Sequence, residues 1–171
     1  MYFYLSHFPR RWAPERTVTM KEIAVIGFGV VGGGVVSLID ECAPHISKAV
    51  GEDVHVKYIL DLRDFPQLSY QELFTKDFSE IESDDSISIV VEAMGGLHPA
   101  YEYVKSCLEK GKSVVTSNKE LVAEKGAELL AVAKEKNVNF FFEASVGGGI
   151  PVIRPMHLCL AANELKTVYG I

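Results

Sequence analysis

The chain has 171 residues, of which 48% are hydrophobic and 23% charged, an ordinary balance for a globular domain with its own core. The net charge is −6, and the three arginines and one glutamate of the first 19 residues leave residues 20–171 at −8. An acidic domain is poorly suited to binding nucleic acid or an anionic lipid surface. No apolar run approaches the ~20 residues of a membrane-spanning helix. Neither nucleic acid nor a membrane is therefore expected as a partner.

The first 19 residues differ in composition from the rest and are interpreted as an N-terminal extension without a fixed fold. Their arginines follow a short apolar stretch, whereas a secretory signal places its positive charge before one. A transit peptide stays open as an alternative.

The three cysteines, Cys42, Cys107 and Cys159, lie far apart in apolar, helix-like contexts. We interpret them as buried free thiols. An odd count without metal-like spacing is typical of a reducing compartment, so the cytoplasm is the expected location.

From Met20 on, strand-like and helix-like segments alternate. Strands are predicted at 21–26, 54–60, 87–91, 113–116, 138–143 and 165–169. Helices are predicted at 30–50, 99–110 and 119–136, with a loop and a short helix over 63–80 and a further helix after 151. Strands joined through helices imply right-handed crossovers and a mainly parallel sheet covered on both faces. The predicted fold class is therefore α/β, a doubly wound parallel sheet of the nucleotide-binding (Rossmann) type.

Residues 27–32 read GFGVVG, a G-x-G-x-x-G pattern between the first predicted strand and the first predicted helix. In this pattern Gly27 allows a tight turn, Gly29 lets the backbone approach a pyrophosphate, and Gly32 lets helix and strand pack closely. The diphosphate is then expected at the helix N-terminus, where free amides and the helix dipole favour an anion. The pattern predicts dinucleotide binding; a glycine-rich turn without a ligand is the alternative.

The next predicted strand ends in LDLRD, residues 60–64. Asp61 would accept hydrogen bonds from an adenosine ribose and favour NAD, whereas Arg63 would pair with the additional phosphate of NADP. Asp61 lies 29 positions after Gly32 instead of the usual ~20, because the first helix and its loop are long. The choice between NAD and NADP stays open, as does the alternative that one of the two residues is only a surface charge.

Two further predicted strands end in segments that would face a ligand. In EAMGG, residues 92–96, we expect Met94 and Gly95 beside the nicotinamide ribose, with a ligand-free glycine turn as the alternative. In TSNK, residues 116–119, Ser117 and Lys119 stand where a strand passes into a helix. Lys119 could hold a carboxylate or polarise a carbonyl, and as a proton shuttle it would need a pKa well below ~10.4. A solvated lysine in a first helical turn is the alternative.

The glycine loop in EASVGGGIP, residues 143–151, turns carbonyl oxygens inward, and such oxygens suit a hard cation; a hinge to the next domain is the alternative. His98 follows the double glycine and could touch a substrate, or be a solvated residue at the start of a helix. The other histidines after residue 20 stand alone, and no Ser/His/Asp or Cys/His arrangement can be argued.

Taken together and in this order, GFGVVG, VVEAMGG, VVTSNKELVA and FFEASVGGGIPVI resemble homoserine dehydrogenase, from about Lys21 to Ile171. GFGVVG is shared by many dehydrogenases, and the other three segments carry the specificity. The resemblance implies an oxidoreductase that interconverts aspartate semialdehyde and homoserine with NAD or NADP. That reaction belongs to the biosynthesis of threonine, methionine and isoleucine.

The same resemblance implies roles for individual residues. Phe28, Val30 and Val31 would lie on the cofactor beside the glycines, and Lys119 would be the active-site lysine, close to nicotinamide and substrate. A monovalent cation site, usually sodium, would take its oxygens from Glu143, Val146, Gly148 and Ile150.

The family continues beyond the residues that match Ile171 into a substrate-binding region with acidic residues and a second catalytic lysine, and it dimerises largely through that region. We therefore expect an extension at 1–19, an NAD(P)-binding domain at 20–150 and the beginning of a catalytic domain at 151–171. The chain alone is expected to bind cofactor without being catalytically complete, and the intact protein to be a homodimer or larger.

Two rival interpretations rank below this one. A non-catalytic NAD(P)-binding regulatory module would need only GFGVVG. A thioester-forming semialdehyde dehydrogenase would need an activated cysteine, and no cysteine here follows a predicted strand end.

Overall fold

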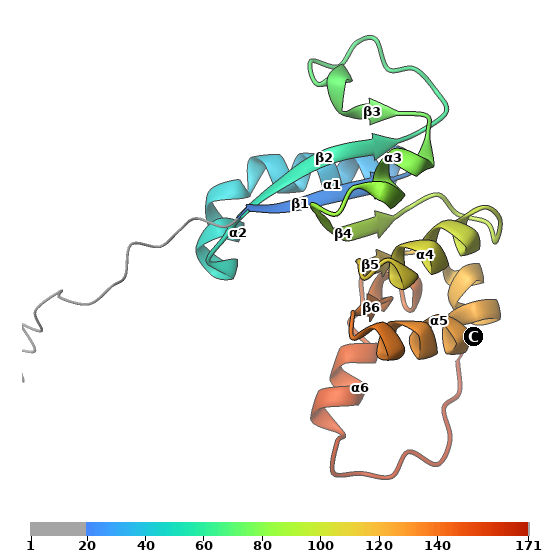
Figure 1. Ribbon diagram of the computed structural model, residues 1–171. Helices are drawn as coiled ribbons and strands as arrows, with labels where there is room; N and C mark the ends of the chain where they lie inside the picture. The colour runs from blue at the N-terminus through green and yellow to red at the C-terminus, as the bar shows by residue number, and fades with distance from the viewer. Residues whose placement is uncertain (1–19, 171) are drawn as a thin grey trace, which may run out of the picture.

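The computed structural model describes residues 20–170, so the extension predicted at 1–19 lies outside the described residues. The described part is built around a six-stranded sheet in the order β3-β2-β1-β4-β5-β6, with every neighbouring pair parallel (Figure 1). The strands are β1 (Met20–Ile26), β2 (Asp53–Leu60), β3 (Phe74–Thr75), β4 (Ile87–Glu92), β5 (Ser113–Thr116) and β6 (Phe140–Phe141). The helices are α1 (Val30–Glu41), α2 (Ala43–Val50), α3 (Phe78–Ser83), α4 (Ala100–Glu109), α5 (Lys119–Lys136) and α6 (Ile153–Cys159), with 3-10 turns at Gln71–Leu73 and Glu143–Ser145. The predicted doubly wound α/β class is confirmed.

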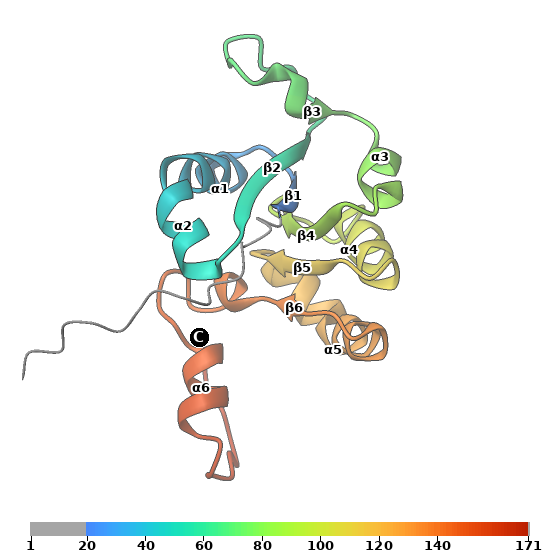
Figure 2. The ribbon, with the colours of Figure 1, turned by 60° about the vertical axis from the view of Figure 1, so that its left-hand side comes forward.

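Helices cover the sheet on both faces, as Figure 2 shows, with α1 and α2 on one side and α3, α4 and α5 on the other. The strands separate two hydrophobic clusters because successive side chains point to opposite faces. Ile23 and Val25 of β1 pack on the α1 side with Val36, while Ala24 and Ile26 pack on the other side. Burial of both strand faces explains why β1 reads as a continuous apolar run.

The chain order reverses between β1 and β4, the two central strands. Because all strands run parallel, the segments that follow them gather at one edge of the sheet. A doubly wound sheet binds its ligands at that edge, beside the point where the strand order reverses. The glycine turn after β1 and the loop after β4 are adjacent there: Ala93 N donates a hydrogen bond of 2.8 Å to Ile26 O.

The helix predicted over 119–136 is confirmed as α5, but several other boundaries were wrong. The single helix predicted over 30–50 is two helices that break at Cys42, because Pro44 in the first turn of α2 has no N–H for a continuous helix. The two-residue strand β3 was missed. The strand predicted over 138–143 is only the two residues of β6, since a 3-10 turn starts at Glu143.

The strand predicted over 165–169 is absent from the described residues: this segment is exposed and has no strand partner. The cysteine prediction was right only for Cys107, which is buried, whereas Cys42 is partly buried and Cys159 is exposed. Among residues 20–170 no helix is both long and apolar enough to cross a membrane.

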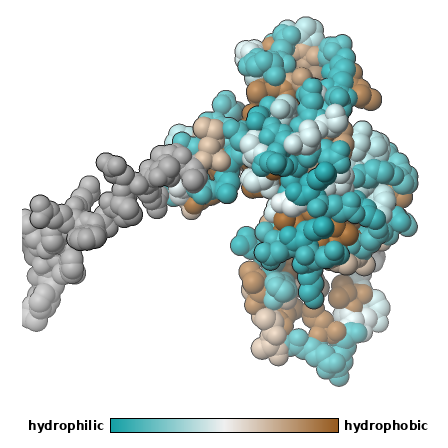
Figure 3. All heavy atoms as spheres, in the orientation of Figure 1, coloured by the Kyte–Doolittle hydropathy of each residue, from teal (hydrophilic) through white to brown (hydrophobic). Residues whose placement is uncertain are grey.

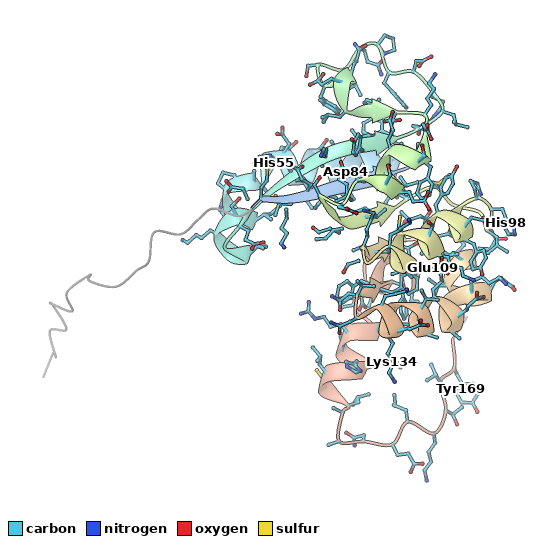
Figure 4. All side chains as sticks on the ribbon, in the orientation of Figure 1. His55, Asp84, His98, Glu109, Lys134 and Tyr169 are labelled. Carbon is cyan, nitrogen blue, oxygen red and sulfur yellow. The ribbon has the colours of Figure 1, made fainter. Side chains whose placement is uncertain are left out.

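An ion pair joins β2 to the turn before β4 at Asp84, which Figure 4 labels. Lys57 Nζ lies 2.7 Å from Asp84 Oδ2, and the amide and hydroxyl of Ser86 donate to Oδ1 at 2.9 and 2.7 Å. The hydrogen bonds from Lys57 and Ser86 lower the pKa of the Asp84 carboxyl well below its ordinary value. A carboxyl whose folded-state pKa is depressed stabilises the fold above its unfolded-state pKa, and this contribution is lost as the pH falls toward the folded-state value.

We expect Asp84→Asn to lower the melting temperature by a few degrees at pH 7, and expect the difference from the unsubstituted chain to shrink as the pH falls below about 4. Thermal melts of both chains between pH 7 and pH 2 measure this. Asp85→Asn is the control, because Asp85 is exposed and makes no interaction within the described residues. A difference that stays constant down to pH 2 would show that the carboxylate charge is not what stabilises this turn.

Candidate functional site

Three glycines shape the turn from β1 into α1, each for a different physical reason. Gly27 has a φ of +94°, and a Cβ there would lie 2.9 Å from the Ala93 carbonyl group. A Cβ on Gly32 would lie 1.8 Å from the carbonyl oxygen of Gly27, so the close approach of helix and strand requires glycine. Gly29 has ordinary extended backbone angles and nothing within 4 Å of its Cβ position. Neither backbone strain nor packing within the protein requires glycine at position 29. The absence of a side chain there keeps the space in front of the turn open.

The N-terminus of α1 is an open site for an anion. Its N-cap is Gly29, and no side chain caps the helix or places a negative charge in its first turn. The amides at the start of a helix have no acceptor within the helix and carry the positive end of its dipole. Val30 and Val31 beside them are 95% and 52% exposed, although they are apolar. A bound group with an anionic and an apolar part would satisfy both features.

Asp61 and Arg63 form one compact unit after β2. The Asp61 carboxylate accepts hydrogen bonds of 2.9 Å from the Arg63 amide, from two guanidinium nitrogens of Arg63 and from the Phe28 amide. Hydrogen bonds from the Arg63 guanidinium hold the pKa of the Asp61 carboxyl well below its usual range, and the two amides make a smaller contribution in the same direction. Both oxygens of Asp61 therefore have donors within the chain. The Arg63 side chain is 64% exposed, and its third hydrogen bond reaches Phe28 O at 3.0 Å.

Phe28, which was predicted to lie on the cofactor, and Lys76, which was not predicted, lie on this side of the site in different surroundings. The Phe28 ring packs edge-on against Phe65 and Phe74, with centroid distances of 4.9 and 5.0 Å, in an aromatic group beyond the edge of the glycine turn. Lys76, just after β3, pairs with Asp64 at 2.7 Å and is 54% exposed. Lys76 and Arg63 line the same hollow, and each is an exposed cation that is paired with an aspartate, Asp64 and Asp61 respectively.

That hollow is a cavity of about 370 Å³ at the edge where the strands end. It extends from the glycine turn to the loop after β4 and reaches Pro99 and Tyr103 at the start of α4. Residues that line it include Gly29, Leu60, Arg63, Lys76, Met94 and Tyr103. A second cavity of about 320 Å³ adjoins it, lined by Arg63, Phe65 and Lys76 among others. The place predicted from the motifs is therefore concave.

The loop after β4 and the start of α5 carry the other predicted residues. Met94 is 37% exposed, and Gly95 and Gly96 adopt left-handed backbone angles, with φ of +80° and +74°. Ser117 is half-buried, and its amide donates to Glu92 O at 3.3 Å. Lys119 is the exposed first residue of α5, and no side chain in the described part of the protein pairs with it. Its side chain can therefore contact a ligand bound at this edge of the sheet.

Sequence reasoning missed a buried polar group beneath these residues. Glu92, Thr116 and Asn118 are 0%, 1% and 5% exposed, and hydrogen bonds connect all three. A signal was present in the sequence, because Glu92 ends an otherwise apolar strand where a charged residue is costly to bury.

The loop that follows β6 places the four predicted cation ligands in different surroundings. The Glu143 carboxylate accepts hydrogen bonds from the amides of Val152, Ile153 and Arg154, the last two at 2.9 and 2.7 Å, which lowers the pKa of Glu143. This carboxylate therefore caps α6. Gly148 and Ile150 are exposed and Val146 is half-buried. No cluster of three or more acidic, histidine or cysteine side chains suited to a metal occurs in residues 20–170.

His98 lies outside this arrangement. Its ring is exposed and its Nδ1 is 2.6 Å from Glu102 Oε1, one turn further along at the start of α4 (Figure 4). This geometry favours the interpretation of His98 as a solvated residue at the start of a helix over a contact with substrate.

The fold and the glycine turn together define a Rossmann domain of the doubly wound class, with its ligand edge at β1 and β4. Within that class the chain belongs to one family: the family model described as "Homoserine dehydrogenase, NAD binding domain" matches residues 27–143.

Curated relatives and solved structures agree with this assignment. Homoserine dehydrogenase of Corynebacterium glutamicum is 41% identical over 152 residues, and that of Neisseria gonorrhoeae is 38% identical over 151; each match covers 87% of this chain. The crystal structure of a homoserine dehydrogenase from Thiobacillus denitrificans superposes with a TM-score of 0.77 at 36% identity, over 85% of this chain and 34% of that one. The structure of a hyperthermophilic archaeal homoserine dehydrogenase in complex with NADPH superposes with a TM-score of 0.67 at 28% identity, over 81% of this chain and 48% of that one. The chain spans about a third of the length of the curated relatives, 34% of the Corynebacterium protein and 35% of the Neisseria protein.

Proposed function

We propose that this chain is the cofactor-binding part of a homoserine dehydrogenase and binds NADP(H) at the edge where β1, β2 and β4 end. One observation carries the proposal: the uncapped N-terminus of α1 opens onto free space at Gly29, beside a cavity lined by the exposed cations Arg63 and Lys76. The phosphate groups of a dinucleotide require hydrogen-bond donors that have no other acceptor, space to approach the backbone closely, and nearby cations.

The residues after β2 favour NADP over NAD. The Asp61 carboxylate is already engaged by Arg63 and by the Phe28 amide, so it is poorly placed to accept hydrogen bonds from ribose hydroxyls. Arg63 and Lys76 are exposed in the cavity and suit an additional phosphate. The archaeal relative whose structure contains NADPH has the same fold.

The substrate side would lie beside Met94, Gly95, Ser117 and Lys119, at the ends of β4 and β5. A bound nicotinamide would supply or accept the hydride. Lys119, exposed and unpaired in the described part, would position aspartate semialdehyde or homoserine and polarise the reacting carbonyl. In this proposal the rest of the substrate site comes from the region that the longer relatives have and the described residues lack.

A monovalent cation in the loop after β6 would be held through main-chain oxygens. The Glu143 carboxylate is engaged at the start of α6, whereas Gly147 and Gly148 give the loop a tight left-handed path. The carbonyl groups of Glu143, Val146, Gly148 and Ile150 would then be the ligands, as a hard cation prefers.

Residues 151–171 are proposed to begin a second domain through which the intact protein would dimerise. No residue of α6 is buried, and Leu158, Leu165 and Val168 are exposed although apolar. Figure 3 shows hydrophobic residues gathered around α6 and the segment that follows it, and a cavity of about 600 Å³ lies between α6 and β6. A homodimer, a cytoplasmic location and a role in the biosynthesis of threonine, methionine and isoleucine belong to this proposal for the whole protein.

Calorimetric titration of the 171-residue chain with NADPH, and separately with NADH, tests the proposal. We expect binding of NADPH with a micromolar Kd and binding of NADH at least about 10-fold weaker, the difference that one charge-assisted contact of ~1.4 kcal/mol makes. Circular dichroism on the same sample shows that the chain is folded. A folded chain that binds neither nucleotide would overturn the proposal.

A further inference from the structure

Glu92 is the last residue of β4 and its side chain is fully buried. Both of its carboxylate oxygens accept hydrogen bonds: Oε1 from the Met94 amide at 2.8 Å and from the Gly95 amide at 3.4 Å, and Oε2 from the Thr116 hydroxyl. No lysine, arginine or histidine in the described part pairs with it. Burial of a carboxylate among uncharged donors is costly, so a hydrophobic residue would be the stable choice if packing alone mattered.

The hydrogen bonds of Glu92 belong to a closed circuit across the ends of two strands. Thr116 Oγ1 accepts from the Asn118 amide at 2.9 Å, and Asn118 Nδ2 donates to Gly96 O at 2.6 Å. The circuit therefore returns through Gly96 to the loop that Glu92 holds. Asn118 also caps α5 by accepting from the Leu121 amide at 3.1 Å, so the first turn of that helix is part of the same unit.

The two segments that the circuit connects are those that would face the nicotinamide half of the cofactor. Met94 and Gly95 are exposed above Glu92, and no atom lies within 4 Å of the Cβ positions of Gly95 and Gly96. Lys119 directly follows Asn118 and is exposed at the same edge. The circuit thus lies beneath a surface that is open to a ligand.

We propose that Glu92 is a positioning residue for the nicotinamide side of the site: with Thr116 and Asn118 it fixes the loop at 94–96 relative to the first turn of α5 that carries Lys119. The inference rests on the proposed function and goes beyond it, because Glu92 is fully buried and would act through the loop and α5 instead of touching cofactor or substrate. Fixing both segments before binding removes the ordering cost that a loop with two left-handed glycines would otherwise add.

Two ligands that differ only in the nicotinamide test this role in the 171-residue chain: NADPH and 2′-phospho-ADP-ribose. We expect Glu92→Gln to weaken NADPH binding roughly 10-fold, the effect of losing about one buried hydrogen bond to a charged group, and to change the Kd of 2′-phospho-ADP-ribose less than about 2-fold. Thr116→Val should give the same selective loss without any change of charge, and Thr116→Ser, which keeps the hydroxyl, should restore the binding. The threonine pair keeps the test decisive if Glu92→Gln does not fold.

Lys112→Met is the matched control. Lys112 is also buried, at 2% exposed, but its Nζ donates to Asp84 O and Ile87 O at the opposite edge of the sheet. We expect this variant to melt at a lower temperature with an unchanged ratio of the two Kd values. Equal losses for both ligands in Glu92→Gln and Thr116→Val, or no loss for either, would overturn the positioning role. Equal Kd values for both ligands in the unsubstituted chain would overturn it as well. A folded unsubstituted chain that binds neither ligand would instead overturn the proposed function, and the inference with it.

Discussion

Gly29→Ala leaves the chain folded and lowers its affinity for NADPH by roughly 5- to 150-fold, the effect of about 1–3 kcal/mol of overpacking against the ligand. The backbone at Gly29 has a φ of −90° and a ψ of −157°, which alanine adopts without strain, and no protein atom lies within 4 Å of the new Cβ. The added methyl group therefore costs the free protein almost nothing. It occupies the space through which a diphosphate would reach the amides of α1.

The neighbouring glycines provide the contrast. Gly32→Ala places a Cβ 1.8 Å from the Gly27 carbonyl oxygen, so α1 has to move away from β1, and we expect a loss of roughly 3 kcal/mol or more in the free energy of unfolding. Gly34→Ala lies on the exposed part of α1 with nothing within 4 Å. It should raise stability by up to about 1 kcal/mol and leave binding unchanged.

Urea denaturation and calorimetric titration of the three variants separate these effects. The interpretation of Gly29 would be wrong if Gly29→Ala bound NADPH as tightly as Gly34→Ala does. It would also be wrong if Gly29→Ala lost stability to the same extent as Gly32→Ala.

The parts of the fold that sequence reasoning predicted well are those in which local pattern and tertiary environment agree. The helix over 119–136 has a side-chain cap from Asn118 before it and a left-handed Asn137 after it, and both ends can be read from the sequence. The central strands are apolar on both faces because helices cover both sides of the sheet. Right-handed crossovers through helices predicted a parallel sheet, which the structure has.

The failures arise where tertiary contacts decide. The two residues of β3 are a strand only because they pair with Ile59 and Leu60, and two residues carry too little periodicity to indicate a strand. Residues 165–169 have a β-branched, strand-like composition, but a strand needs a neighbour, and none is present among the described residues. Pro44 was an available signal for the break between α1 and α2 that the predicted helix over 30–50 ignored.

At the site, the motifs predicted which segments meet but not how their side chains are engaged. LDLRD contains both an acid and a base, and composition alone could not show that Arg63 occupies the Asp61 oxygens. The role of Glu92 depends on hydrogen bonds to positions 2, 3 and 24 residues away, and no local pattern encodes them together.

Arg63→Ala shifts the preference of the chain from NADPH toward NADH. Removal of the guanidinium withdraws one exposed positive group from the cavity and frees the Asp61 oxygens to accept hydrogen bonds from ribose hydroxyls. A charge-assisted hydrogen bond to a phosphate contributes roughly 1.5–3 kcal/mol, so we expect the ratio of the NADH Kd to the NADPH Kd to fall by about 10- to 100-fold. Asp61 would stay ionised at neutral pH, because the ordinary pKa of an aspartate is about 3.9.

The ratio of the two Kd values is the appropriate measurement because Arg63 also donates to Phe28 O. Loss of that hydrogen bond would loosen the glycine turn and weaken the binding of both nucleotides equally. Lys57→Met is the control: Lys57 is a cation on β2 whose partners are Asp84 and Ser86, away from the cavity, and its loss should leave the ratio unchanged. The affinity for NADPH should also decrease less steeply with salt in Arg63→Ala than in the unsubstituted chain, since one fewer exposed charge pair is screened. An unchanged ratio together with an unchanged salt dependence would mean that Arg63 only supports the turn, and the assignment of an NADP phosphate to this end of the cavity would have to be withdrawn.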